Sequence, residues 1–327
     1  MKHIARRLAF YVAAAWAAIT INFFVPRAMP GNAVDAMMAQ FPHLEPGALK
    51  ALEAEFGVGS DGSLLHQYGS YLVNILHGNL GTDLTQFPTP VSSIIASTLP
   101  WTLILVGSAT VISFLLGTLL GIFAAWRRGS RFDNLMPGFI FLQATPYFFL
   151  ALLLVDLFAA HLHYFPEQRG YDIGLVPGWH LNFIESALYH SLLPALTIVI
   201  TSVGGWMLGM RNMMITTLGE DYVLSAVAKG LAPRRIMLAY GARNAILPSF
   251  AAFSTSLGLV VSGALIMEVV FAYPGVGLLL YNAVTSNDYP MVQALFLIIS
   301  LAVLGANLIA EVVYVLVDPR TRTAEAA

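Results

Sequence analysis

Residues 219–248 read GEDYVLSAVAKGLAPRRIMLAYGARNAILP and form the one long polar interruption between two strongly apolar halves of the chain. Glu220 and Asp221 suit the start of a helix, because acidic side chains interact favourably with the positive end of the helix dipole. Lys229 and Gly230 suit the end of that helix, since glycine readily adopts the left-handed conformation that closes many helices. The pattern predicts a first short helix in this stretch.

A second helix is predicted directly after the turn. Pro233 fits a first helical position, where the missing backbone N–H costs nothing, and Arg234 and Arg235 follow it. The next apolar residues are interpreted as one stripe, made of Ile236, Leu238 and Tyr240. The stretch is therefore predicted to be a helix–turn–helix with a basic rim, the part of a membrane protein that meets a soluble partner.

The composition places the chain in a membrane. Hydrophobic residues make up 57% of the sequence and charged residues 10%, and the mean hydropathy is +0.73. These values lie far outside the range of a soluble domain. The sequence contains no cysteine, which excludes disulfides and thiolate metal sites.

Six segments are apolar enough to cross a bilayer, whose core needs roughly 20 apolar residues per helix. They are residues 8–25, 99–126, 135–160, 188–210, 245–267 and 291–310. The predicted fold is an all-α integral membrane protein with six transmembrane helices. An even number of spans places both termini on the same side of the membrane.

The basic residues indicate which side that is. Thirteen Lys and Arg residues fall in the segments on the side of the termini and three on the other side. Because cytoplasmic loops carry the excess of Lys and Arg, both termini and the 211–244 loop are predicted to be cytoplasmic in a multi-pass protein of the cell (inner) membrane. These loops account for nearly all of the positive charge, so no basic surface is left for nucleic acid. The first apolar run lacks a following small-residue cleavage site and is interpreted as a retained span.

The topology divides the chain into four predicted regions. Residues 1–28 form the N-terminal cytoplasmic end and the first span, and residues 29–97 an extracytoplasmic segment. Residues 98–317 form the core transmembrane domain, with the polar loop at about 213–245, and residues 318–327 are a cytoplasmic tail.

The extracytoplasmic segment is predicted to contain two amphipathic helices. The first covers residues 46–57, opened by Pro-Gly and closed by Gly57. The second has an apolar face and ends at Gly78. Its apolar positions are Leu65, Tyr68, Leu72 and Ile75. Both helices are expected on the outer membrane face or at the mouth of the pathway.

Two further patterns concern the spans themselves. Gly107, Gly117 and Gly121 in the second span are small residues of the kind that let helices approach closely in lipid. Thr145-Pro146 interrupts the third span and is predicted to kink it.

The order of sub-motifs in residues 219–248 is similar to that of a known family. The motifs are Asp221-Tyr222-Val223, Ser225-Ala226, Ala228-Lys229-Gly230-Leu231, Arg234-Arg235, Arg243-Asn244-Ala245 and Leu247-Pro248. In this order they resemble the EAA loop of the permease subunits of binding-protein-dependent ABC importers. The form resembles the first permease of the dipeptide, oligopeptide and nickel branch. Leu224 departs from the pattern, because that position of the E-A-A triplet is often charged.

The resemblance extends along nearly the whole chain. Further matching motifs lie at 30–32, 78–81, 90–91, 268–271, 274–277, 288–290 and 318–320. The resemblance implies the MetI-like fold of type I importer permeases, with cytoplasmic coupling helices that sit in a groove of an ATPase subunit. The residues it implies for ATPase coupling are Asp221, Ser225, Ala226, Lys229, Gly230, Arg234, Arg235, Arg243 and Pro248.

The resemblance also implies a transport mechanism and its partners. The permease is expected to form half of a translocation pathway for di- and oligopeptides that works by alternating access. The implied partners are a second permease subunit in a heterodimer, two cytoplasmic ATPase subunits, an extracytoplasmic substrate-binding protein and membrane lipid. The chain has no G-x-x-x-x-G-K-[ST] phosphate loop, so ATP hydrolysis is expected on a partner and not on this chain.

The fifth span is predicted to line the pathway. It follows Pro248 and is the span richest in small and polar side chains, as expected of a helix that does not face lipid. With the family-like motifs at its external end, the predicted pathway or gate residues are Ser254, Ser262, Gly263, Glu268, Pro274, Gly275, Gly277 and Asp288.

No catalytic residue, cofactor or metal site is predicted. A predicted external loop of about 27 residues contains His161, His163, His180 and His190. His161 and His163 lie two residues apart, which is weak evidence for metal binding. A membrane-bound enzyme is disfavoured because no nucleophile–base arrangement is present. The alternatives are a stand-alone secondary transporter or channel, and an importer of the same architecture that carries oligosaccharides or a nickel chelate.

Overall fold

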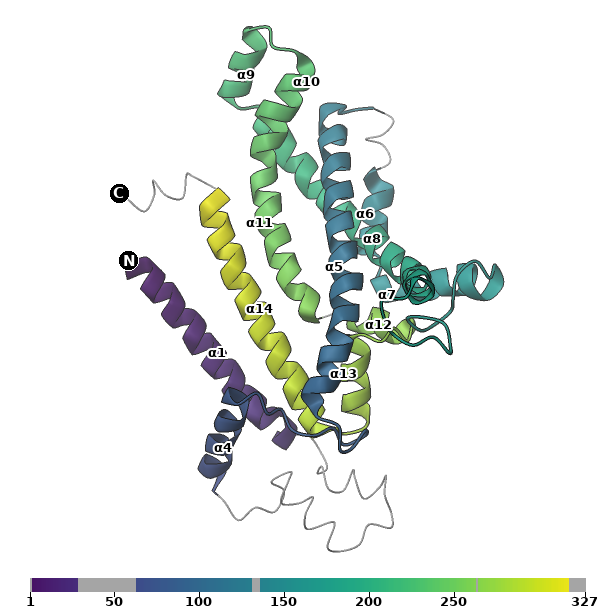
Figure 1. The fold of residues 1–327 in the computed structure, drawn as a ribbon. Helices are drawn as coiled ribbons and strands as arrows, with labels where there is room; N and C mark the ends of the chain where they lie inside the picture. Colours follow the sequence, from purple (N-terminus) through teal and green to yellow (C-terminus); the bar gives the residue numbers. More distant parts are fainter. Residues whose placement is uncertain (1, 29–62, 131–135, 263, 318–327) are drawn as a thin grey trace, which may run out of the picture. The chain divides into compact units, whose positions relative to one another are not determined.

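The computed structural model describes residues 2–28, 63–130, 136–262 and 264–317. Within these ranges the regular structure is helical, apart from one isolated bridge between Thr82 and Pro90. The elements in chain order are α1 (Lys2–Ala28), α4 (Leu64–Leu76), α5 (Val91–Trp126), α6 (Met136–Ala144), α7 (Tyr147–Leu154), η2 (Val155–His161), α8 (Leu181–Leu218), α9 (Asp221–Ala228), α10 (Pro233–Arg235), η3 (Ile236–Ala242), α11 (Arg243–Leu259), η4 (Val260–Ser262), α12 (Leu265–Val270), α13 (Val276–Thr285) and α14 (Tyr289–Val317) (Figure 1).

The all-α fold predicted from the sequence is confirmed for this part of the chain. The predicted second amphipathic helix corresponds to α4, and Gly78 follows it with a φ of +71°. The helix predicted at residues 46–57 and the motifs at 30–32 and 318–320 lie outside the described residues.

The helices differ in how clearly they can span a membrane. Val91–Trp126, Leu181–Leu218 and Tyr289–Glu311 are long and apolar enough by themselves, and α6 with α7 and η2 counts as a fourth span if its bend is allowed. Ala9–Val25 is apolar but shorter. The predicted fifth span is divided between α11, η4 and α12. The count of six spans therefore stays a prediction.

The structure divides into two compact units that do not follow the order of the sequence. The first comprises Met1–Thr102, Val261–Leu265 and Pro274–Leu304. The second comprises Leu103–Val260, Ile266–Tyr273 and Gly305–Ala327. The predicted core region 98–317 thus contributes to both units, and each unit is described by itself.

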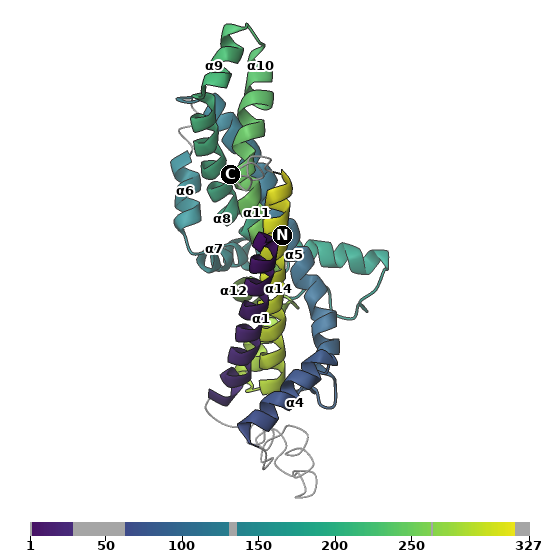
Figure 2. The same ribbon diagram turned by 90° about the vertical axis from the view of Figure 1, so that its left-hand side faces the viewer.

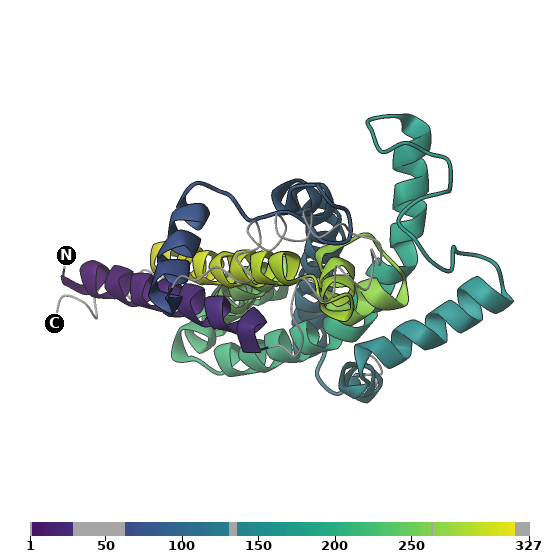
Figure 3. The same cartoon turned by 90° about the horizontal axis from the view of Figure 1, so that it is seen from below.

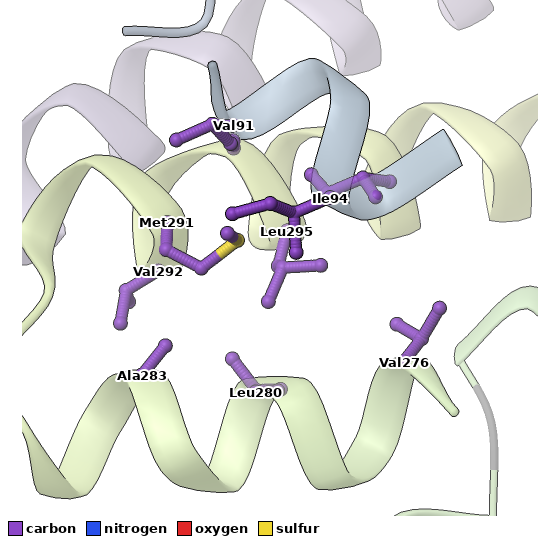
Figure 4. Close-up of a cluster of buried hydrophobic side chains, with 10 residues drawn as sticks. Val91, Ile94, Val276, Leu280, Ala283, Met291, Val292 and Leu295 are labelled. Atoms are coloured by element: carbon purple, nitrogen blue, oxygen red, sulfur yellow. The ribbon is translucent and has the colours of Figure 1, made fainter. Parts of the chain in front are cut away.

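The first unit is built around a cluster of aliphatic side chains from three helices (Figure 4). The beginning of α5 contributes Val91 and Ile94, α13 contributes Leu280, and α14 contributes Met291 and Leu295. All five are less than a tenth exposed. Because lipid is as apolar as these side chains, the packing is held by close van der Waals fit as well as by removal of surface from water.

The second unit depends on a close approach of α5 and α8. A Cβ atom on Gly121 would lie 2.6 Å from the carbonyl oxygen of Met207 and 2.8 Å from the Cβ of Met210. A Cβ atom on Gly117 would overlap Trp206 and the backbone of Val203. The prediction that glycines permit close packing is confirmed for these two positions. Gly107 differs, because its nearest neighbour leaves room for an ordinary contact.

The third span is bent where the sequence predicts. α6 and the segment Tyr147–His161 meet at an angle of 98° across Thr145-Pro146. The residue before a proline is pushed out of the helical conformation, which explains why α6 ends at Ala144. The loop at residues 162–180 then connects η2 to α8 (Figure 3). It is shorter than the predicted loop of about 27 residues, because α8 begins at Leu181 and already contains His190.

The helix that carries the predicted fifth span begins at Arg243. Pro248 therefore lies inside α11, which follows η3 without a break. The point at which the span enters the membrane stays a prediction. A proline in a membrane helix removes one backbone hydrogen bond but does not have to end the helix when neighbouring groups compensate.

We predict that Gly121→Leu destabilises the chain, because the side chain has no room between α5 and α8. Overpacking of this kind costs about 1–3 kcal/mol or more. Thermal unfolding in detergent should show a clearly lower midpoint. Gly209→Leu is the matched control, since nothing lies within 4 Å of a Cβ at Gly209. Equal midpoints for the two variants would contradict the close approach of α5 and α8.

Candidate functional site

The segment 219–242 forms a hairpin that we name the polar hairpin. It follows α8, consists of α9, a turn, α10 and η3, and leads directly into α11. Figure 1 and Figure 2 both show α9 and α10 side by side beyond the adjoining ends of α8 and α11. The predicted helix–turn–helix is confirmed, with the difference that its second helix continues into the membrane helix.

The beginning of α9 has the predicted polarity. Glu220 is the N-cap residue with extended backbone dihedrals, and its carbonyl oxygen accepts hydrogen bonds from the N–H groups of Val223 at 2.9 Å and Leu224 at 3.2 Å. Asp221 occupies the first turn and is exposed. Its negative charge therefore lies at the positive end of the helix dipole.

The turn after α9 is closed by Gly230, whose φ is +70°. The Gly230 N–H donates to the carbonyl of Val227 at 2.9 Å, and the Leu231 N–H donates to that of Ala226 at 3.3 Å. This pair of bonds defines a Schellman motif, in which a left-handed residue satisfies the last carbonyls of the helix. The left-handed conformation predicted for Gly230 is confirmed.

The inner face of the polar hairpin is apolar. Val223 and Ala226 from α9 and Ile236 from η3 are 2%, 2% and 6% exposed. They pack with partly buried neighbours on either side, namely Trp126, Leu218, Leu231 and Tyr240. Ala226 therefore supports the fold of the hairpin from inside and does not form part of its surface.

The predicted stripe on the second helix is wrong at one position. Ile236 is buried and Tyr240 is half-buried, but Leu238 is 55% exposed. Residues two positions apart point to different sides of a helix, so a stripe of alternating positions cannot lie on one face.

The outer face of the polar hairpin combines cations with apolar side chains. Ser225, Lys229, Arg234 and Arg235 are exposed, as expected of residues that contact a partner. Leu224 and Val227 are each 56% exposed and were not among the predicted coupling residues. The sequence contained a hint for Leu224 alone, since this is the position at which the chain departs from the charged residue of the family pattern.

The polar hairpin is tied to the helices that carry it. The Asn244 side-chain amide donates to the Tyr222 hydroxyl and to the Tyr240 carbonyl, both at 3.0 Å. Met210 and Met214 of α8 pack against Ala242 and Ala245, all nearly fully buried. Arg243 and Pro248 are exposed on α11. Packed contacts and hydrogen bonds therefore join α9 to α8 and α11.

Two of the predicted pathway residues, Ser254 and Glu268, belong to the second unit. Ser254 lies on α11, and its hydroxyl donates to the Phe250 carbonyl of the preceding turn at 3.0 Å. Ser262 ends η4 and belongs to the first unit, whereas Gly263 lies outside the described residues. Glu268 is fully buried on α12, and its carbonyl accepts a hydrogen bond from the Tyr273 N–H at 2.8 Å.

The remaining pathway residues, from Pro274 to Gly277 and Asp288, belong to the first unit. Gly275 is the N-cap residue of α13, and Gly277 is buried in its first turn. The N–H of Val276 donates to the Thr102 hydroxyl at 2.7 Å, which fixes the start of α13 against α5. Their role in the pathway stays a prediction.

Asp288 lies in a buried network just before α14. Its carboxylate oxygens accept hydrogen bonds from the N–H groups of Leu84 at 2.8 Å and Met291 at 3.0 Å. Asp83 is also buried and its carboxyl group is hydrogen-bonded to that of Asp288. Burial raises the pKa of Asp288 to about 7, and the negative charge of Asp83 acts in the same direction. The sequence analysis did not pair these two carboxyl groups.

The four histidines that the sequence analysis placed in a predicted external loop do not come together. His161 Nδ1 lies 3.5 Å from Asp156 Oδ1, whereas His190 is buried on α8 with Nδ1 2.9 Å from the Ser186 carbonyl oxygen. Within the part of the chain that the structure describes, no three metal-ligating side chains form a group.

The sequence was compared with known proteins. Residues 117–323 match the family described as binding-protein-dependent transport system inner membrane component. The chain is 32% identical to a di/tripeptide transport system permease protein of Pseudomonas aeruginosa, over 98% of this chain and 99% of the relative. It is 30% identical to oligopeptide transport system permease proteins of Bacillus subtilis, over 92% of each chain, and of Haemophilus influenzae, over 98% of this chain and 99% of the relative.

We predict that the stability of the chain falls as the pH rises from about 4 to about 7. A carboxyl group whose folded-state pKa is raised favours the folded state at low pH. This contribution is lost between the ordinary pKa of 3.8 and the folded-state pKa of about 7. Asp288→Asn keeps a neutral side chain and should flatten the pH dependence of stability. The loss of one hydrogen-bond acceptor should lower the free energy of unfolding by about 1 kcal/mol.

Thermal unfolding midpoints across this pH range provide the measurement. Asp156→Asn is the control, because the Asp156 side chain is 72% exposed. The burial of Asp288 would be refuted by an Asp288→Asn variant that keeps the full pH dependence of the unmodified chain.

Proposed function

Because the chain belongs to the family of binding-protein-dependent transport system inner membrane components, we propose that it is the permease subunit of an ABC importer that carries di- and oligopeptides. It is a multi-pass membrane protein. In the proposed complex it forms half of the translocation pathway, and a second permease subunit forms the other half. Two cytoplasmic ATPase subunits supply the energy, and an extracytoplasmic binding protein delivers the substrate.

The observation that carries this proposal is the structure of the polar hairpin. Its Schellman turn and buried apolar face make it a preformed element that folds within this chain. Its outer face presents Leu224 and Val227 beside exposed cations. An apolar centre with a charged rim is the usual composition of a protein interface. These features suit insertion into a groove on an ATPase subunit.

The continuity of the hairpin with α11 supports a mechanical role. The chain runs from Pro233 to Leu259 through α10, η3 and α11 without a loop. Met210 and Met214 of α8 pack against the junction of η3 and α11. When the ATPase subunits close on ATP, the hairpin moves with its groove, and both membrane helices follow. Alternating access results from this displacement, since packed helices move as rigid bodies.

Peptides are the proposed substrates because the matched relatives are named for them. The di/tripeptide and oligopeptide permeases quoted above align along nearly the full length of this chain. In the proposed pathway α11 supplies Ser254, and the segments around it supply Ser262, Gly263 and Glu268. Pro274, Gly275, Gly277 and Asp288 are proposed to shape the external end.

The proposed orientation follows the distribution of Lys and Arg. Both termini and the polar hairpin are cytoplasmic, and α4 lies on the opposite side, because thirteen of the sixteen basic residues fall on the side of the termini.

We predict that Gly230→Val uncouples transport from ATP hydrolysis. A valine at a φ of +70° is strained by about 1–2 kcal/mol, although nothing lies within 4 Å of its Cβ position. The strain opens the turn between α9 and α10. It shifts the equilibrium between the docked and the undocked hairpin by roughly 5- to 30-fold toward the undocked state. Uptake of a labelled dipeptide and the amount of co-purified ATPase should both fall, at an unchanged level of protein in the membrane.

Gly129→Val is the matched control for this variant. Gly129 has a φ of +78° and equally open surroundings, so the two substitutions carry the same backbone strain. It lies in the turn after α5 and outside the polar hairpin. Unimpaired uptake by the Gly230 variant, or equal impairment of both variants, would show that this turn has no coupling role.

The orientation is tested with single cysteines, since the chain has none of its own. We predict that an impermeant maleimide added to intact spheroplasts labels Ser70→Cys on α4, whereas Ser225→Cys on α9 reacts only after the membrane is permeabilised. Both residues are exposed, so differences in burial do not explain a different reactivity. The reverse labelling pattern would show that the assignment of sides is wrong.

A further inference from the structure

The helix α4 has three distinct faces. None of its residues is buried, although more than half of them are apolar or aromatic. One face packs on α1, one carries polar side chains, and one is apolar and exposed. The third face needs an explanation, because an isolated soluble helix of this length would not keep such a surface in water.

The first face fixes α4 to the end of α1. The ring of Phe23 lies 5.2 Å from that of Tyr68 and 5.6 Å from that of Tyr71, measured between centroids. The Tyr68 hydroxyl is 2.7 Å from that of Thr20, and the Asn22 amide donates to the Tyr71 hydroxyl at 3.0 Å. Figure 1 shows α4 next to the end of α1 that precedes residue 29.

These contacts determine the depth of α4 in the membrane. The α1 residues involved lie within the last two turns of its apolar stretch, Ala9–Val25. Arg27 follows, and its guanidinium group donates to the Phe23 carbonyl at 2.7 Å and to the Gln67 side chain at 3.1 Å. A charged residue one turn beyond an apolar span marks the boundary between hydrocarbon and headgroups. At a rise of about 1.5 Å per residue, α4 lies within roughly one or two turns of that boundary.

The third face is a stripe along the helix. Leu65 and Leu76 are 82% and 84% exposed. They are separated by about three turns, and Leu72 lies on the same side between them. Ser70 and Asn74 point to the opposite side and are exposed. The helix is therefore amphipathic at the depth where one side meets acyl chains and the other meets water.

We propose that α4 is an interfacial helix that inserts the stripe formed by Leu65, Leu72 and Leu76 into the acyl region of the leaflet at the C-terminal end of α1. On α1, which packs against α4, Ile21 and Phe24 are also exposed, by 64% and 51%. α4 contains no Lys, Arg, Asp or Glu residue, so its membrane contact is hydrophobic and does not select anionic lipids. The proposal holds for either orientation of the chain.

In transport, the inserted α4 anchors the first and the last predicted spans together. The same Asn22 amide that donates to Tyr71 also donates to the Gln293 carbonyl of α14 at 2.7 Å. By holding Tyr71 at a fixed depth, the inserted stripe keeps α1 and the beginning of α14 in register at the membrane surface.

Spin labels on single cysteines test the proposal directly. Leu65→Cys, Leu76→Cys, Ser70→Cys and Asn74→Cys are each labelled with a nitroxide in the full chain, together with its co-purifying subunits, in phosphatidylcholine vesicles. Collisions with oxygen, which concentrates in acyl chains, are compared with collisions with a water-soluble nickel chelate. All four residues are exposed, so the labels displace no packed side chain.

We expect oxygen collisions to dominate at residues 65 and 76 and nickel collisions to be several-fold more frequent at residues 70 and 74. Replacing part of the lipid with an anionic lipid should leave these ratios unchanged. Equal and high nickel accessibility at all four positions would place α4 in water at the mouth of the pathway and overturn the proposal. Low accessibility to both reagents at residues 65 and 76 would show that another protein surface covers the stripe, which would equally overturn it.

Discussion

No peptide N–H or C=O group can remain without a partner inside a bilayer, because each unpaired group costs several kcal/mol in hydrocarbon. This constraint explains why the described chain is almost entirely helical. It also makes the few interruptions of the helices informative, because backbone groups at an interruption need other partners. Examples are the bend at Thr145-Pro146 and the interruption between η4 and α12. The second precedes Glu268, a residue proposed for the pathway.

Within this helical frame, close packing takes the place of the hydrophobic effect between helices. Gly117 and Gly121 let α5 meet the backbone of α8, and the Met210–Met214 segment of α8 then packs against the junction of η3 and α11. The polar hairpin extends from this rigid assembly. Its own interior is small, yet the Schellman turn at Gly230 and the buried Val223 and Ile236 give it a defined shape. In the docking role proposed for the hairpin, this fixed shape lets it transmit a displacement without first having to fold.

Interactions that depend on distant residues were not predicted. Leu84 and Asp288 are 204 residues apart, and their hydrogen bond exists only because the segment before α5 meets the turn before α14. The contact of Asn22 with Gln293 spans 271 residues. An asparagine inside an apolar span is a visible signal of a polar partner, but the sequence does not identify that partner. The exposure of Leu224 and Val227 was also missed, since it depends on which side of α9 packs against Ile236 and Trp126.

The sequence by itself determined the membrane class, most of the helical segments, the bend at Pro146 and the turn at Gly230. These features depend on local hydropathy and on backbone preferences of proline and glycine, which act over a few residues. Only the tertiary structure decided that Ala226 lies inside the polar hairpin, that α11 starts before Pro248, and that Asp83 meets Asp288. Such outcomes are set by the packing of segments far apart in the chain, and no local pattern encodes which surfaces will meet.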